Sequence, residues 1–251
     1  MPRALVVSAI SHLGLIAIYL LTAALLLKSA ASLGWPGVTV ALISYLAISA
    51  LVLIGLLRLE HHLCFGGANA LTLMRAATAT LFLGIVVDAL LAKDTLAFNT
   101  ELQWILAALA TAALLVDGLD GWVARRKGMA SEFGAHFDME TDALSMAALS
   151  SLVYTEREVG AWVLLGGVMR YLFVTAGFVW PPLGAPLLPS ARRKTICVVQ
   201  MAALITALAP AVPTRVAQGI CLSSLVLLIY SFGADCTWLQ RTHLTRQRPR
   251  T

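Results

Sequence analysis

The apolar stretch ALVVSAISHLGLIAIYLLTAALLL, residues 4–27, indicates the class of protein to which this chain belongs. It contains no Asp, Glu, Lys or Arg, and it exceeds the roughly 20 residues that a helix needs to cross a bilayer. The apolar core of a secretory signal peptide is only about 7–15 residues long. We therefore interpret residues 4–27 as a transmembrane helix and not as a cleaved leader.

Further apolar stretches of similar length follow at residues 37–57, 71–92, 102–118, 136–154, 160–179, 195–212 and 216–235. Hydrophobic residues make up 59% of the 251 residues and charged residues only 12%, about half the share in a soluble domain. The sequence therefore predicts an all-α, polytopic transmembrane helical bundle of about eight spans. The net charge of +5 does not indicate a nucleic-acid partner, because basic residues of membrane proteins collect beside anionic lipid headgroups.

The distribution of Lys and Arg indicates an orientation. If the N-terminus is cytoplasmic, only Lys28, Lys93, Arg157 and Arg215 fall on the opposite side, and Arg170 falls within a span. All other Lys and Arg residues are then cytoplasmic, as the positive-inside rule requires, and an even number of spans places both termini there. We expect a multi-pass protein of a bacterial cytoplasmic membrane, with its active site on the cytoplasmic side.

Four aspartates flank the loop between the fourth and fifth apolar stretches. Asp117 and Asp120 are three residues apart and Asp138 and Asp142 are four apart, and each spacing places two side chains on one helix face. The joining loop is short, so we expect neighbouring helix ends and four converging carboxylates. Such a cluster at the edge of hydrocarbon needs neutralising cations, and its all-oxygen character favours two Mg²⁺ or Mn²⁺ ions.

Small residues and one arginine accompany these aspartates. Gly118 and Gly121 leave the helix surface bare, so that a nucleotide can approach the backbone. Gly134 permits close packing of the fourth and fifth helices. Arg125 is a planar cation that suits phosphate oxygens.

This segment resembles the CDP-alcohol phosphatidyltransferase family, whose signature is D-x2-D-G-x2-A-R-x8-G-x3-D-x3-D. The fixed positions are matched by Asp117, Asp120, Gly121, Ala124, Arg125, Gly134, Asp138 and Asp142. The resemblance covers roughly residues 60–240 and implies a six-helix catalytic core preceded by two additional helices. We accordingly divide the chain into the N-terminal helices at 1–57, the core at 58–240 and a basic cytoplasmic tail at 241–251.

The resemblance also implies roles for the aspartates. Asp117, Asp120 and Asp138 are expected to ligate the two cations. Asp142 is expected to ligate a cation and to act as the catalytic base toward the acceptor hydroxyl.

A polar stripe opens the third apolar stretch. Asn69, Thr72 and Arg75 follow one another at intervals of three residues and resemble the family's N-x-x-T-x-x-R element. Amide, hydroxyl and guanidinium groups at a helix start suit a nucleotide. The residues expected to bind CDP are Asn69, Thr72, Arg75, Asp117, Gly118, Gly121, Ala124, Arg125 and Gly134.

Basic residues on later stretches are candidates for the acceptor site. Arg170 lies within a span, where an arginine must face an anion or a polar cavity. Arg192, Arg193 and Lys194 precede the seventh stretch, where they either bind a phosphate of the acceptor or contact lipid headgroups.

The resemblance implies a membrane transferase of phospholipid biosynthesis. It would transfer a phosphatidyl-type group from a CDP-linked donor, with CDP-diacylglycerol favoured, to an alcohol acceptor and release CMP. The reversed arrangement, a CDP-amino-alcohol with diacylglycerol as acceptor, uses the same chemistry. A divalent-cation transporter is the alternative from another class. Family members commonly form homodimers, so a homodimer is expected here.

Overall fold

The computed structural model describes residues 3–57, 65–91, 99–127, 132–157, 159–180, 183 and 190–247, and of these it does not describe the side chains of 3–6, 57, 119–127, 132 and 243–247. These residues form helices and no strand, which confirms the all-α prediction for the described part of the chain. The α-helices are α1 (Arg3–Ala31), α2 (Trp35–Leu57), α3 (Gly67–Leu91), α4 (Thr100–Lys127), α5 (Glu132–Glu156), α6 (Leu164–Val179), α7 (Ala191–Leu208) and α8 (Thr214–Gln247), and a 3₁₀ helix η1 (Ala161–Val163) precedes α6.

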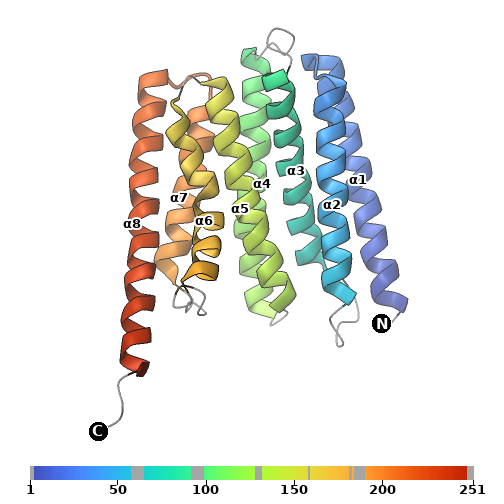
Figure 1. Cartoon of the computed structure of the whole chain (residues 1–251). Coiled ribbons are helices and arrows are strands. Elements are labelled where there is room, and N and C mark those ends of the chain that lie inside the picture. Colours follow the sequence, from blue (N-terminus) through green and yellow to red (C-terminus); the bar gives the residue numbers. More distant parts are fainter. Residues whose placement is uncertain are drawn as a thin grey trace.

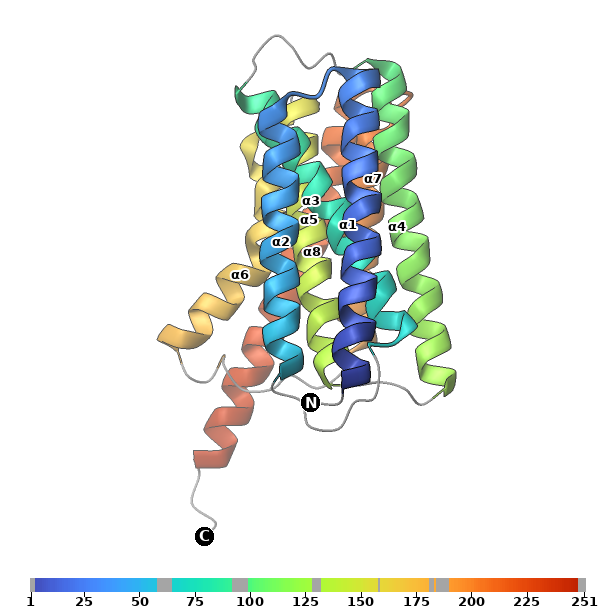
Figure 2. The same ribbon diagram turned by 90° about the vertical axis from the view of Figure 1, so that its right-hand side faces the viewer.

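The helices run side by side in one bundle (Figure 1), and Figure 2 shows that the lower part of α6 leans away from it. The first residues of α1 and the last residues of α8 lie at the same end of the bundle (Figure 1). Among the described residues, six helices are long and apolar enough to span a membrane, namely α1, α2, α3, α4, α6 and α8. The chain is therefore an integral, multi-pass membrane protein.

Two helices that the sequence also predicted as spans, α5 and α7, do not meet this criterion. The reason is their charge content. Asp138, Glu140 and Asp142 interrupt the apolar surface of α5, and three consecutive basic residues, Arg192 to Lys194, open α7. Both helices nevertheless lie within the same bundle as the six candidate spans (Figure 1).

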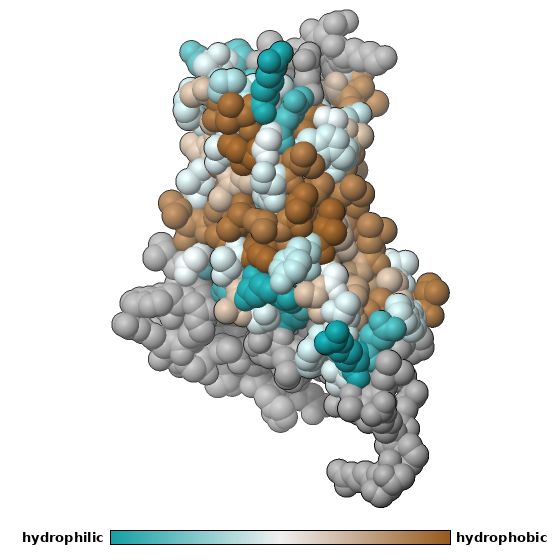
Figure 3. All heavy atoms as spheres, turned by 90° about the vertical axis from the view of Figure 1, so that its left-hand side faces the viewer, coloured by the Kyte–Doolittle hydropathy of each residue, from teal (hydrophilic) through white to brown (hydrophobic). Residues whose placement is uncertain are grey.

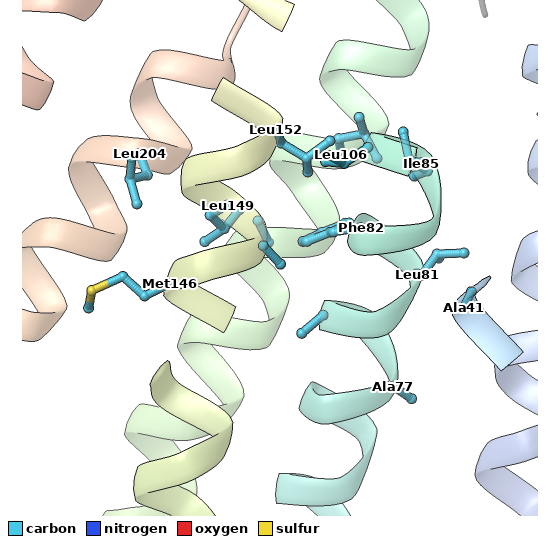
Figure 4. Close-up of a cluster of buried hydrophobic side chains, with 14 of the residues drawn as sticks. Ala41, Ala77, Leu81, Phe82, Ile85, Leu106, Met146, Leu149, Leu152 and Leu204 are labelled. Carbon is cyan, nitrogen blue, oxygen red and sulfur yellow. The ribbon is translucent and has the colours of Figure 1, made fainter. Parts of the chain in front are cut away.

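A core of aliphatic and aromatic side chains holds the middle of the bundle together. Figure 4 shows Phe82 and Ile85 of α3 facing Leu149 and Leu152 of α5, with Leu106 of α4 beside them. All five side chains are buried. On the outside, a hydrophobic band crosses the middle of the face that carries α8, and hydrophilic residues lie toward both ends (Figure 3). Such a band is the expected surface of a bundle embedded in lipid.

The N-terminal helices α1 and α2 pack closely against α3. A Cβ added to Gly84 of α3 would lie 2.3 Å from the carbonyl oxygen of Gly37, and one added to Gly37 of α2 would lie 2.8 Å from that of Gly84. Only glycines allow the two backbones to approach so closely. The Tyr45 hydroxyl of α2 in turn donates a 2.8 Å hydrogen bond to the Leu13 carbonyl of α1.

Asp88, near the C-terminal end of α3, links this helix to the start of α2. Its side chain is buried, and its Oδ2 accepts a 2.7 Å hydrogen bond from the Gly34 N–H, directly before α2 begins. A carboxylate at a helix N-terminus satisfies an otherwise unpaired donor and interacts favourably with the helix dipole. This contact gives Asp88 a structural role.

We expect the Asp88→Ala variant to be less stable than the wild type by about 1–3 kcal/mol, because it leaves the half-buried Gly34 N–H without its acceptor. Thermal unfolding of the purified protein in detergent measures this difference. The Asp88→Asn variant is the control, since its amide oxygen can still accept the bond, and it should fall between the other two. An Asp88→Ala protein as stable as the wild type would contradict the capping role.

Candidate active site

Three carboxylates from two helices converge at the end of the bundle where α4 ends and α5 begins. Asp117 comes from α4, and Asp138 and Asp142 lie one turn apart on α5. One oxygen from each lies within 4.8 Å of one from each of the others. The predicted convergence is therefore confirmed for these three residues. Hard carboxylate oxygens at this separation fit Mg²⁺ or Mn²⁺, so the donor set suits a divalent cation.

Arg75 of α3 lies directly beside these carboxylates, which we call the carboxylate cluster (Asp117, Asp138 and Asp142). Its Nη1 donates to Asp117 Oδ1 at 2.5 Å and to Asp138 Oδ1 at 2.8 Å, and its Nη2 donates to Asp142 Oδ1. The sequence predicted Arg75 as a nucleotide contact, and no ion pair with the aspartates was expected. Three negative charges face one positive charge, so the cluster retains a negative excess that a cation can neutralise.

The other two residues of the predicted nucleotide element lie on α3 before Arg75. Asn69 is half-buried and donates a 2.6 Å hydrogen bond to the Phe65 carbonyl. Thr72 is buried and donates to the Ala68 carbonyl at 3.1 Å. Both side chains therefore support the first turns of α3, on the stretch of helix that leads to the carboxylate cluster.

The remaining signature residues are only partly described. Asp120, Gly121, Ala124 and Arg125 lie in α4, but their side chains are outside the described part of the structure, so their predicted contacts stay predictions. Gly118 is exposed, and an added Cβ there would meet no atom within 4 Å. This open surface beside Asp117 is compatible with the predicted approach of a nucleotide.

Gly134 is a half-buried residue in the first turn of α5. The expectation that it permits close packing of α4 and α5 is wrong for the described residues, because these two helices make few direct contacts. Each of them packs instead against α3 and α7. The carboxylate cluster therefore joins two helices that are connected through their shared neighbours α3 and α7.

Three of the predicted acceptor residues form ion pairs with acidic residues that the sequence did not indicate, and those of Arg170 and Arg192 are the closest. Arg170 of α6 forms an ion pair with Glu140 of α5. Arg192 of α7 pairs with Asp235 of α8 at 2.5 Å and also donates to the Ser231 carbonyl at 3.4 Å. Asp235 is buried in an apolar stretch, and the rule that an acidic residue in a span needs a partner could have identified it.

Two further basic residues lie beside the same groups. Arg193 approaches Asp235 at 3.6 Å. Lys194 is exposed and lies near enough to Asp117 for the two opposite charges to attract. The start of α7 thus places positive charge next to the carboxylate cluster.

The fold and the site define a helical integral membrane protein with a carboxylate cluster at one end of its bundle whose oxygens suit a divalent cation. Residues 65–230 match the family model described as CDP-alcohol phosphatidyltransferase, which is more than half of the chain. The protein therefore belongs to the CDP-alcohol phosphatidyltransferase family, a class of transferases that act on a CDP-linked donor and an alcohol acceptor. No individual curated protein and no solved structure matches the chain significantly. The helices α1 and α2 precede the matched segment.

Proposed function

We propose that this protein transfers a phosphatidyl-type group from CDP-diacylglycerol to an alcohol and releases CMP, as a step of phospholipid biosynthesis. The convergence of Asp117, Asp138 and Asp142 carries this proposal, because a cluster of hard oxygen donors in this family's signature segment suits a diphosphate substrate. A membrane-embedded enzyme is appropriate since the donor and the product are lipids.

The proposed cation site holds two divalent ions, Mg²⁺ or Mn²⁺, on Asp117, Asp120, Asp138 and Asp142. When bound, such ions neutralise the donor diphosphate and the negative charge that develops on the departing CMP. The described geometry supports three of the four ligands, which lie within 4.8 Å of one another. For Asp120 the support is its position in α4, one turn after Asp117.

Other residues bind and orient the two substrates. Asn69, Thr72, Gly118 and Gly121, with Arg125, are proposed to hold the cytidine and its phosphates; the open surface at Gly118 supports this placement. Ala124 and Gly134 are proposed to contact CDP as well, because they occupy fixed positions of the family signature.

Asp142 is proposed to orient the acceptor hydroxyl and accept its proton. The acceptor oxygen then forms a bond to the phosphorus remote from cytidine, and the bond from that phosphorus to the CMP oxygen breaks. Positioning the hydroxyl in line with the leaving group accounts for much of the acceleration.

The acceptor side is assigned to the basic residues of α6 and α7. Arg170, Arg192, Arg193 and Lys194 would attract an acceptor that carries its own phosphate. Asp235 and Glu140 already neutralise part of this charge, and Lys194, whose charge attracts Asp117, is the best placed of the four.

The remaining features of the proposal concern the whole molecule. We propose eight spans with both termini and the site on the cytoplasmic side of a bacterial inner membrane, a catalytic core at residues 58–240, and a homodimer. The shared end of α1 and α8 supports the orientation (Figure 1). Asp88 is the only carboxylate of α3, and its hydrogen bond from Gly34 gives it a structural role, which disfavours a cation path along this helix.

The test is CMP release by the purified protein in detergent micelles that contain CDP-diacylglycerol and a panel of alcohols. We expect release only when Mg²⁺ or Mn²⁺ and one particular class of alcohol are both present, and we expect EDTA to abolish it. Supplying a CDP-amino-alcohol with diacylglycerol tests the reversed arrangement. Donor that stays intact under every combination, with cation flux across liposomes instead, would overturn the proposal in favour of a transporter.

A further inference from the structure

Arg75 lies on the buried side of the carboxylate cluster. Its side chain is only 4% exposed, whereas those of Asp138 and Asp142 are 45% and 37% exposed. The accessible sides of these carboxylates therefore face away from the guanidinium. Arg75 therefore lies on the inner side of the carboxylate cluster, and a cation or diphosphate that enters from solvent contacts the carboxylates before it reaches Arg75.

The hydrogen bonds of Arg75 leave ligand atoms available. Each of the three aspartates presents a single oxygen, its Oδ1, to the guanidinium. A carboxylate has two oxygens, so the second oxygen of each remains for a cation. Arg75 and a cation can thus use the same three carboxylates at once.

The space beneath the guanidinium does not allow it to withdraw. A cavity of about 20 Å³ adjoins Arg75 and is also lined by Thr78 and Ser145. This volume holds about one water molecule and is too small for a guanidinium group. Arg75 therefore has no room to move into this cavity, and because it uses one oxygen of each aspartate, a cation can bind without displacing it.

We propose that Arg75 is a positioning residue that gathers Asp117, Asp138 and Asp142 into a preformed cation site, an inference that rests on the proposed metal-dependent function. Three carboxylates from two helices that barely touch would repel one another, and the guanidinium replaces that repulsion with charge-assisted hydrogen bonds. Groups that orient metal ligands from behind typically contribute 10–100-fold to metal affinity. This role differs from a direct contact with the nucleotide.

Mn²⁺ binding to the purified full-length protein in detergent, measured by electron paramagnetic resonance at one fixed pH without nucleotide, tests the inference. We expect the Arg75→Met variant to bind Mn²⁺ about 10–100-fold more weakly than the wild type. The Mn²⁺ affinity of Arg75→Lys should lie between those of the wild type and Arg75→Met. A single ammonium group cannot donate to three separate carboxylates as the forked guanidinium does. The matched control is Arg157→Met at the opposite end of α5, where the guanidinium donates to the Val212 carbonyl; its affinity should equal that of the wild type.

The same variants distinguish this role from a purely structural one. Excess Mn²⁺ should restore much of the CMP release by Arg75→Met. Under these conditions the KM of the variant for the donor should equal that of the wild type. Unchanged Mn²⁺ affinity with weakened CMP binding would overturn the proposal and make Arg75 a nucleotide contact. Tighter Mn²⁺ binding would also overturn it, because Arg75 would then compete with the cation.

If Arg75→Met does not fold, Arg75→Lys is the test variant, because it keeps the positive charge. Wild-type Mn²⁺ affinity in Arg75→Lys would then overturn the proposal.

Two outcomes separate this inference from the proposed function. A wild-type protein that binds no Mn²⁺ overturns the metal site itself and the inference with it. A wild-type protein that binds Mn²⁺ no better than folded Arg75→Met overturns only the positioning role.

Discussion

The Asp142→Asn variant is expected to release CMP about 10³-fold more slowly than the wild type, which corresponds to about 4 kcal/mol of transition-state stabilisation. Asparagine keeps the size of the side chain but removes its negative charge. It is a poor ligand for a divalent cation, and it cannot accept the proton of the acceptor hydroxyl. Both proposed roles of Asp142 are lost together, so the effect should be the largest of any single substitution in the cluster.

The measurement is initial rates of CMP release at saturating CDP-diacylglycerol, alcohol and Mn²⁺. Thermal unfolding in EDTA checks that the variant is folded, which we expect because Arg75 keeps its ion pairs with Asp117 and Asp138. The control is Glu101→Gln, an exposed residue in the first turn of α4, far along the helix from Asp117; its rate should equal that of the wild type. A folded Asp142→Asn enzyme with more than about a tenth of the wild-type rate would remove Asp142 from the reaction centre.

The positions of the helices could be predicted from apolar runs, but their ends could not. The run at 102–118 predicted α4, which continues to Lys127, and the run at 216–235 predicted α8, which continues to Gln247. Hydropathy marks the part of a helix that lies in hydrocarbon. Polar residues can extend the same helix beyond the membrane surface, so the helix is longer than its apolar run.

The carboxylate cluster could be predicted in part because its spacing is local. Asp138 and Asp142 share a helix face at four residues apart, and the short sequence between the two helices predicted that Asp117 would lie near them. The partner of these aspartates could not be predicted in the same way. Arg75 lies on another helix, 42 residues before Asp117, and no periodicity in the sequence links the two.

The same limit applies to the other ion pairs and to helix packing. Asp235 and Glu140 reach their arginines across helix interfaces, 43 and 30 residues away in the sequence. The small residue at Gly134 predicted a close approach of α4 and α5, whereas the closest glycine contact in the described residues joins α2 and α3. A small residue permits a close approach, but only the tertiary structure selects the partner.

That glycine contact leads to a second large effect: the Gly84→Ala variant should be less stable than the wild type by about 3 kcal/mol, the upper end of the range for overpacked sites. The added Cβ would lie 2.3 Å from the Gly37 carbonyl oxygen and 3.0 Å from the Ala41 Cβ. Because the closer atom belongs to the backbone, no side-chain rotation can relieve the clash, and α2 must move away from α3. The matched control is Gly14→Ala in α1, where an added Cβ meets nothing within 4 Å.

Thermal unfolding in detergent compares the two variants, and the intrinsic helix propensity of alanine, about 1 kcal/mol better than glycine, applies equally to both. Gly14→Ala should therefore be as stable as the wild type or slightly more stable, and the difference between the variants isolates the clash. The result also decides how the N-terminal helix pair relates to the catalytic helices. At the other end of α2, Gly55 abuts the ring of Phe133, in the first turns of the helix that carries Asp138. If α1 and α2 were a separable attachment, Gly84→Ala would leave the unfolding of the core unchanged; if they brace α3 and α5, it should weaken Mn²⁺ binding as well as stability.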